Sequence, residues 1–336
     1  MDEMNMLQDR IGEYLIPRVD EFLFDELSDS YLAKAGIADI LSGVPVPIRK
    51  TAMANLSTLV IAQNMAFIIG CDLNFKYRDN YVAYIRRTFT EEFAKPLIGD
   101  GVEAAAKSDF DSACIYFRAA LLIDPENVDA LYCYGRACKD SYEAGEGEEY
   151  IGRYKAESLD AFERLTLKKP DFDMGFYFLG YGYLNLGLYV KAKLTWETFM
   201  ELSENQEQKD EVAGWLEKLE EPVKIEEGYN HVLAGRFEEG IAVLSGYEDD
   251  ERFNTWWPLW YYLGVAYEAA GEAEKAKARF LQVLQLSPSN TTAMDELAAL
   301  YEAEGDDVMA EKYRKKIQLV KQNAELDRAE KLEGMS

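Results

Sequence analysis

One 34-residue segment, 257–290, constrains the fold more than any other feature of the chain. Small, aromatic and aliphatic residues recur in it at helical spacing, and a proline closes it: Trp260, Leu263, Gly264, Tyr267, Ala276, Phe280 and Pro288. Residues three and four apart lie on one face of a helix. Gly271 allows the left-handed backbone of a tight turn, and Pro288 stops a helix because it lacks an N–H donor. The segment therefore predicts two helices that pack against each other.

The same spacing recurs over about 94–324, with glycine at the expected turns Gly187, Gly235 and Gly305. This pattern resembles the tetratricopeptide repeat, in which Trp, Leu, Gly and Tyr are followed by Ala, an aromatic residue and Pro. The resemblance implies an all-α fold, a right-handed α-α superhelix of about five to six helix pairs. The expected repeats are 94–127, 128–172 with a loop insertion at 140–150, 173–206, 221–256, 257–290 and 291–324. An extra amphipathic helix is expected at 207–220, and a C-terminal helix end or tail at 325–336.

Small residues at the eighth and twentieth places of each repeat let two helices approach closely, to about 8–9 Å. One helix pair cannot bury its apolar face alone, so several must stack to form a continuous core. The pattern therefore predicts an array rather than separate domains.

Residues 1–93 show no such period and are expected to form an N-terminal helical region of unknown role. Four or five helices are predicted around Ile11/Leu15, Phe22/Leu23/Leu27 and Tyr81/Tyr84/Ile85, with a break at 42–47, where two prolines forbid a helix. Residues 51–71 carry no charge and have the length of a membrane span. Polar residues in the middle of this stretch, Asn64 among them, favour a buried helix over a transmembrane one.

The charge balance is strongly acidic, with 62 Asp and Glu against 36 Lys and Arg, a net charge of −26. Such a field repels phosphate backbones and anionic lipids, so neither a nucleic acid nor a membrane is an expected partner. The acidic start of the chain is unlike a signal peptide. The four cysteines have no metal-ligand spacing, and we expect reduced, mostly buried thiols and a cytoplasmic location.

No group of residues indicates catalysis. The single histidine, His231, falls at a repeat position where a tyrosine normally packs, so it is expected in the core rather than in a triad or a metal site. The sequence has no phosphate-binding loop, and the glycines of "GYGYLNLG" belong to a helical pattern. We therefore expect no enzyme activity, no metal and no cofactor.

In proteins with such repeats, the first helix of each repeat lines a concave groove. The resemblance implies a protein- or peptide-binding groove lined mainly by tyrosines, with a small basic edge. Its expected residues are Tyr132, Arg136, Lys139, Tyr177, Tyr181, Asn185, Tyr229 and Tyr261. Tyrosine offers a large contact area at a low cost in conformational entropy.

Several functions remain open from the sequence. The first is a non-catalytic interaction module or scaffold that binds a peptide or helix of unknown identity. The second is a structural scaffold that forms a homodimer, with the groove filled by the protein's own helices. A peptide-sensing regulator would need a basic DNA-binding head, but residues 1–93 hold nine Lys and Arg against fourteen Asp and Glu. An enzyme would need a site within the N-terminal helices.

Overall fold

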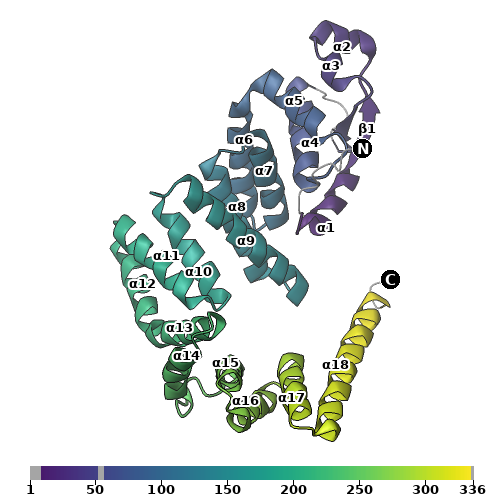
Figure 1. Cartoon of the computed structure of the whole chain (residues 1–336). Coiled ribbons are helices and arrows are strands. Elements are labelled where there is room, and N and C mark those ends of the chain that lie inside the picture. The colour runs from purple at the N-terminus through teal and green to yellow at the C-terminus, as the bar shows by residue number, and fades with distance from the viewer. Residues whose placement is uncertain (1–8, 52–56, 334–336) are drawn as a thin grey trace. The chain divides into compact units, whose positions relative to one another are not determined.

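The computed structural model describes residues 9–51 and 57–333, and the chain divides into two compact units. Unit 1 comprises Met1–Gly187 together with Leu194–Asp210, and unit 2 comprises Leu188–Lys193 together with Glu211–Ser336. Each unit has a hydrophobic core of its own. Helices dominate both units, in agreement with the predicted all-α class (Figure 1).

The N-terminal part of unit 1 combines helices with a small antiparallel sheet of two strands. Its elements are α1 (Gly12–Leu15), the 3₁₀ helix η1 (Ile16–Glu21), β1 (Phe22–Glu26), α2 (Asp29–Ala35), α3 (Ala38–Leu41), β2 (Pro45–Arg49), α4 (Thr58–Cys71), α5 (Arg78–Phe89) and the 3₁₀ helix η2 (Glu91–Phe93). In the sheet, Phe22 pairs with Arg49 and Glu26 pairs with Pro45.

The expectation that Phe22, Leu23 and Leu27 lie on a helix is wrong, because the first two belong to β1 and Leu27 follows it. The prolines that exclude a helix at 42–47 leave an extended segment, and this segment becomes the partner strand β2. Phe22 is buried on one side of the sheet. The spacing of apolar residues in β1 also fits a helix. The strand that pairs with β1 lies about twenty residues away in the sequence, so local spacing does not reveal the pairing.

Most of the charge-free stretch 51–71 forms α4, a helix buried among β2, α5 and α7 (Phe110–Ile123). Residues 52–56 of that stretch lie outside the described residues. Asn64, one of the polar residues that argued against a membrane span, is buried and donates a hydrogen bond from Nδ2 to the Pro47 carbonyl oxygen at 3.0 Å. Among the helices that the structure describes, none is long and apolar enough to cross a membrane.

Asn64→Ala is expected to lower the free energy of unfolding by about 1–2 kcal/mol, because it leaves the Pro47 carbonyl without its buried donor. Urea denaturation followed by circular dichroism measures this loss. Gln63→Ala is the matched control, since Gln63 is the exposed neighbour on the same helix. Equal effects of the two substitutions would show that the bond to β2 contributes nothing.

Three helix pairs follow the N-terminal part (Figure 1). They are α6 (Ala94–Ala106) with α7, α8 (Val128–Ala144) with α9 (Glu148–Lys168), and α10 (Asp173–Asn185) with α11 (Tyr189–Leu202). The boundary between the two units falls within α11 and again within the next helix, α12 (Gln206–Lys218). The predicted repeat boundaries themselves remain a prediction.

The loop expected at 140–150 is wrong. α8 continues to Ala144 and α9 begins at Glu148, so the extra residues lengthen both helices and leave only a short turn. Gly147 makes that turn with a φ of 88°, and the acidic residues Glu148 and Glu149 suit the first turn of α9. The insertion therefore extends the surface of this helix pair.

Unit 2 continues with helix pairs. Its elements are α13 (Glu220–Leu233), α14 (Phe237–Leu244), the 3₁₀ helix η3 (Ser245–Tyr247), α15 (Trp257–Ala269), α16 (Ala273–Leu286), α17 (Thr291–Ala303) and α18 (Asp307–Glu333). The turns at Gly235, Gly271 and Gly305 have φ of 76°, 77° and 81°, and Gly187, which ends α10 in unit 1, has 71°. These glycines confirm the predicted turns. The tail expected from 325 is helical as far as Glu333.

In the pairs α6–α7, α8–α9, α10–α11, α13–α14 and α15–α16, a glycine of the first helix lies against a large side chain of the second. A Cβ added at Gly135 would lie 2.9 Å from the Phe162 ring, and one at Gly264 would lie 2.6 Å from the Phe280 ring. At Gly180 it would overlap the indole of Trp196. The close approach expected from the small residues is therefore real, and an aromatic ring fills the space beside Gly135, Gly180 and Gly264.

Candidate protein-interaction site

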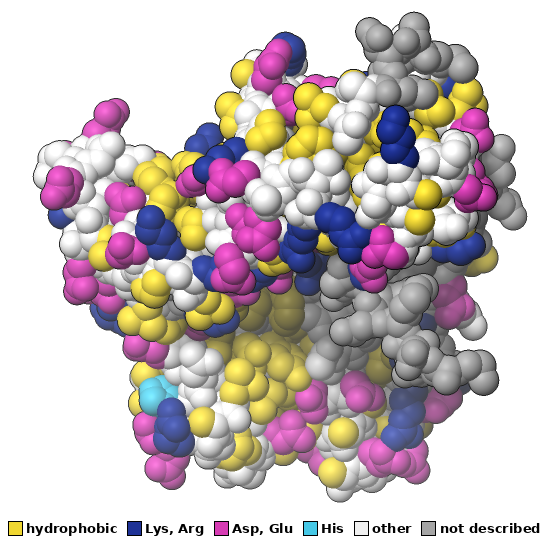
Figure 2. All heavy atoms as spheres, turned by 90° about the horizontal axis from the view of Figure 1, so that it is seen from above, with side chains coloured by type: hydrophobic (Ala, Val, Ile, Leu, Met, Phe, Trp, Pro, Cys, Tyr) yellow, Lys and Arg dark blue, Asp and Glu magenta, His cyan; other side chains and the backbone are white. Residues whose placement is uncertain are grey.

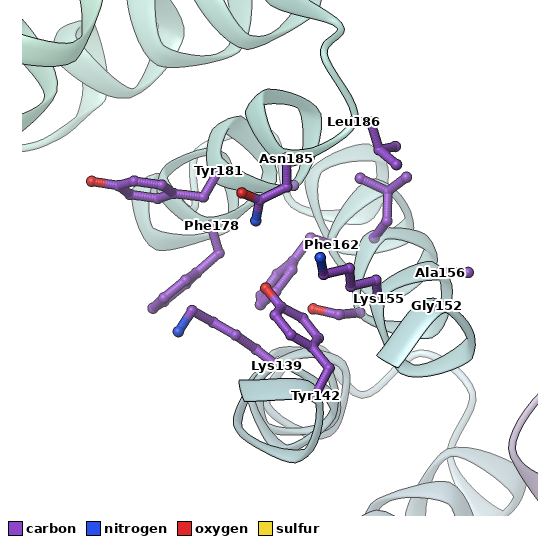
Figure 3. Close-up of a pocket in the computed structure, with 13 residues that line it drawn as sticks. Lys139, Tyr142, Gly152, Lys155, Ala156, Phe162, Phe178, Tyr181, Asn185 and Leu186 are labelled. Atoms are coloured by element: carbon purple, nitrogen blue, oxygen red, sulfur yellow. The ribbon is translucent and has the colours of Figure 1, made fainter. Parts of the chain in front are cut away.

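A pocket of about 180 Å³ opens among α8, α9 and α10 of unit 1 (Figure 3). α8 contributes Lys139 and Tyr142, and α10 contributes Phe178, Tyr181, Gly182, Asn185 and the adjacent Leu186. The side of α9 supplies Gly152, Lys155, Ala156, Ser158, Leu159 and Phe162. The helical extension at 140–150 brings Tyr142 and the first turns of α9 to the edge of this pocket.

Aromatic rings make the floor of the pocket. Phe162 and Phe178 stack with their centroids 5.3 Å apart. The Arg136 guanidinium lies 4.8 Å from the centroid of the Phe178 ring, and the centroid of the Tyr132 ring lies 6.1 Å from it. This floor is apolar and held by neighbours on three helices, so it suits the side chain of a ligand rather than a metal or a phosphate.

The rim of the pocket is polar and partly basic. Figure 3 shows Asn185 and Phe178 pointing from α10 toward Tyr142, with Lys139 and Lys155 on either side. Burial raises the pKa of the Tyr142 phenol to about 12. Lys139 pairs with Glu143 at 2.5 Å, whereas the Lys155 amine lies 5.6 Å from the centre of the Tyr142 ring and makes no ion pair within the described residues.

Three of the predicted groove residues, Lys139, Tyr181 and Asn185, line the pocket. Tyr132 and Arg136 lie beside it, joined by a hydrogen bond of 3.2 Å from the Arg136 Nη1 to the Tyr132 hydroxyl. The Arg136 Nε is buried without a hydrogen-bond partner. The structure therefore gathers five of the eight residues at one surface of unit 1.

Tyr177 and Tyr181, two of the predicted groove residues, pack against the second helix of their pair. Tyr177 packs on Phe199 with centroids 5.3 Å apart, and Tyr181 packs edge-on against Trp196 at 4.9 Å, so both rings contact α11. In Figure 3 the Tyr181 ring points away from the pocket floor. The glycine at 180 draws α11 close, which brings its aromatic rings within reach of both tyrosines.

Phe178 is a site residue that the repeat register did not predict. Its signal was nevertheless in the sequence: Phe178, Tyr181, Gly182 and Asn185 follow the spacing i, i+3, i+4, i+7, which marks one face of a helix. The repeat positions that usually face the groove include Tyr177 and Tyr181 in this helix, and Phe178 is not among them. The helical spacing of these four residues alone predicts the face of α10 that lines the pocket.

Tyr229 and Tyr261 belong to unit 2, whereas the residues of the pocket belong to unit 1. Tyr229 stacks on Tyr262 with centroids 4.6 Å apart, and burial raises the pKa of its phenol. Its hydroxyl is buried and has no hydrogen-bond partner. The Tyr261 hydroxyl donates to Glu296 at 3.0 Å. Both rings lie on the first helices of their pairs, α13 and α15.

His231 is not the core residue that was expected. It lies in the last turn of α13 with 27% of its side chain exposed, and Arg236 donates from Nε to its Nδ1 at 3.0 Å. Figure 2 shows this histidine, in cyan, at the surface, on a face where acidic and basic side chains are interspersed. Within residues 9–51 and 57–333, no three His, Cys, Asp or Glu side chains are grouped to hold a metal.

Comparison with known proteins supports the repeat assignment. Residues 257–290 match the family model of the tetratricopeptide repeat. No curated protein sequence matches the chain. Many solved structures do, but at a level that says nothing about its partners.

Three of these structures illustrate that level. The MamA protein is 18% identical over 69% of this chain and 93% of its own, with a TM-score of 0.27. The TPR domain of P58(IPK) is 19% identical over 71% of this chain and 67% of its own, with a TM-score of 0.41. YrrB, described as a TPR protein with an unusual peptide-binding site, is 17% identical over 63% of this chain and 95% of its own, with a TM-score of 0.31.

The matched segment coincides with α15, α16 and the turn at Gly271, which are the two helices and the glycine that the sequence pattern predicts. Further helix pairs with the same glycine-to-aromatic packing precede it. The chain therefore contains a segment, 257–290, that matches the tetratricopeptide repeat, within a larger all-α array of helix pairs.

Proposed function

We propose that the chain is a non-catalytic cytoplasmic scaffold that binds a peptide segment of a partner protein at the pocket among α8, α9 and α10. One apolar side chain of the peptide occupies the pocket, and an acidic residue beside it meets the basic rim. The observation that carries this proposal is the apolar pocket itself, floored by Phe162 and Phe178 and bordered by Lys139, Tyr181 and Asn185.

Charge complementarity supports an acidic residue in the ligand. Neither Lys155 nor Arg136 forms an ion pair within the described residues, although the whole chain carries a net charge of −26. Unpaired cations beside an apolar pocket favour a partner with a carboxylate, which adds specificity to the apolar contact. The aromatic floor supplies contact area, and the stacked rings are already held in place before binding.

Peptide selection followed by mutation tests the proposal. A random peptide library displayed on phage is panned on the purified full chain, and the affinity of an enriched peptide is measured by fluorescence anisotropy. Ala156→Phe places a ring in the pocket and is expected to weaken binding by at least about tenfold, since filling the pocket removes the buried apolar contact.

Ala106→Phe is the matched control, because Ala106 is exposed at the end of α6 and lies outside the pocket. Lys155→Glu is expected to abolish the preference for acidic peptides while leaving the apolar requirement. Failure to enrich any peptide, or equal binding by the Ala156→Phe and Ala106→Phe variants, contradicts the proposal. The alternative of a homodimeric scaffold is tested on the same samples by light scattering across concentrations.

A further inference from the structure

A second cavity, of about 430 Å³, lies where the N-terminal part of unit 1 meets α7, α8 and α9. Arg10 and Leu73 come from the N-terminal part, and α7 and α9 contribute a further guanidinium each, Arg118 and Arg164. None of these residues belongs to the repeat pattern or to the interaction site described above. The volume is in the range of pockets that hold small molecules.

Arg118 is the unusual residue of this cavity. It is 3% exposed, and its Nη2 donates to the Oδ2 of Asp9 at 2.5 Å. Its Nε and Nη1 are buried and have no hydrogen-bond partner, and neither does the Asp9 Oδ1. Buried donors without acceptors cost free energy, so Arg118 is a charged side chain beside this cavity whose hydrogen bonding is incomplete.

The other lining residues are both polar and apolar. The outer guanidinium groups, Arg10 and Arg164, are 30% and 45% exposed in their side chains. Each is held only loosely by a carboxylate, at 3.6 Å from Glu157 and 3.8 Å from Asp160. Leu73, Leu121 and Leu122 also line the cavity. The cavity thus offers both guanidinium donors and aliphatic surface.

We propose that this cavity binds a small organic carboxylate with an apolar body. The carboxylate accepts hydrogen bonds from Arg118 and from Arg10 or Arg164, and its carbon skeleton lies against Leu73, Leu121 and Leu122. Guanidinium groups match carboxylates in geometry and form charge-assisted bonds that are stronger than neutral ones.

Glu157 and Asp160 favour the binding of a carboxylate over that of a phosphate. Both line the cavity, and a dianionic phosphate would meet their repulsion, whereas a monoanion meets less of it. Burial raises the pKa of the Glu157 carboxyl, against the opposing effect of Arg10 and Arg118. Inorganic phosphate also has no apolar part that could contact the leucine side chains. The observations therefore favour the amphiphilic carboxylate.

The proposal gives the N-terminal part a role that the repeats alone do not supply. Asp9 orients Arg118, while Arg10 and Leu73 complete the wall, so the site exists only where this part packs on α7 and α9. Binding would stabilise that packing, because a ligand that binds only the folded state adds to stability by mass action.

Isothermal titration calorimetry on the full chain tests the proposal with three acids, 4-methylpentanoate, hexanoate and phenylacetate. Their primary amides and inorganic phosphate serve as comparison ligands. At least one acid is expected to bind, with its amide at least about tenfold weaker and phosphate weaker than the acid. No binding by any of the three acids, equal binding by acid and amide, or tighter binding of phosphate overturns the proposal.

Variants locate the site. Arg164→Ala is expected to weaken binding of the acid about threefold or more, because it removes one of the outer donors. Arg87→Ala is the matched control, since Arg87 is 47% exposed, pairs with Asp39 and lies outside the cavity. Arg118→Gln is expected to abolish binding, with circular dichroism to confirm the fold. Equal affinity in the Arg164 and Arg87 variants would place the bound acid elsewhere and overturn the proposal, even if Arg118→Gln fails to fold.

Discussion

The Asp9→Asn variant is expected to lose about 3 kcal/mol of unfolding free energy, the largest single effect that the structure implies. The substitution removes the charge opposite Arg118, whose side chain is 2% exposed, while that of Asp9 is 9% exposed. The Arg118 guanidinium would then stay buried with no carboxylate bonded to it. Breaking a buried pair at one partner is costly because an uncompensated charge remains inside the protein.

Urea denaturation followed by circular dichroism measures this loss, in buffer without organic acids. The double variant Asp9→Leu/Arg118→Met is expected to be more stable than the sum of the single changes implies, because it leaves no unpaired charge. Asp39→Asn breaks the exposed pair with Arg87, at 2.7 Å and 2.9 Å, and is expected to change stability little. If Asp9→Asn behaves like Asp39→Asn, the buried pair does not hold the N-terminal part to α7.

Gly180→Ala is expected to destabilise unit 1 by about 2–3 kcal/mol, although alanine is the better helix former. The new methyl group would overlap the indole of Trp196, which is fully buried and donates from Nε1 to the Tyr177 carbonyl oxygen at 3.1 Å. The ring has no room to move, so α10 and α11 must separate. Overpacking of this kind forces strained side chains or shifts of the backbone.

Gly99→Ala is the matched control for this change. Gly99 also lies within a helix of unit 1, α6, but it is exposed and a Cβ there would meet nothing within 4 Å. We expect a gain of about 0.5–1 kcal/mol, because alanine loses less backbone entropy than glycine in a helix. Two Gly→Ala changes of opposite sign, read from the same urea curves, would confirm that packing against Trp196 sets the identity of residue 180. A gain at both positions would contradict it.

Part of the candidate site could be read from the sequence. The resemblance to the repeat named Lys139, Tyr181 and Asn185, and the structure places all three at one pocket. The resemblance missed Phe178, which forms the floor of the pocket, because the repeat pattern uses the same groove positions in every repeat. The extension of α8 and α9 in this pair changes which residues surround α10, and no rule derived from a 34-residue period contains that extension.

The sequence by itself determined the helix pairs, the turns at Gly187, Gly235, Gly271 and Gly305, and the close approach at Gly180 and Gly264. These features follow from spacing and backbone conformation within about thirty residues, so local physical rules suffice to predict them.

Only the tertiary structure decided the pairing of β1 with β2 and the ion pair of Asp9 with Arg118, which are 109 residues apart. It also decided which side chains surround the two cavities. A strand needs a partner, and a buried charge needs a counterion, but neither local propensity nor spacing says where in a long chain that partner lies. Packing in three dimensions settles such pairings, because each contact depends on how all the intervening helices are arranged.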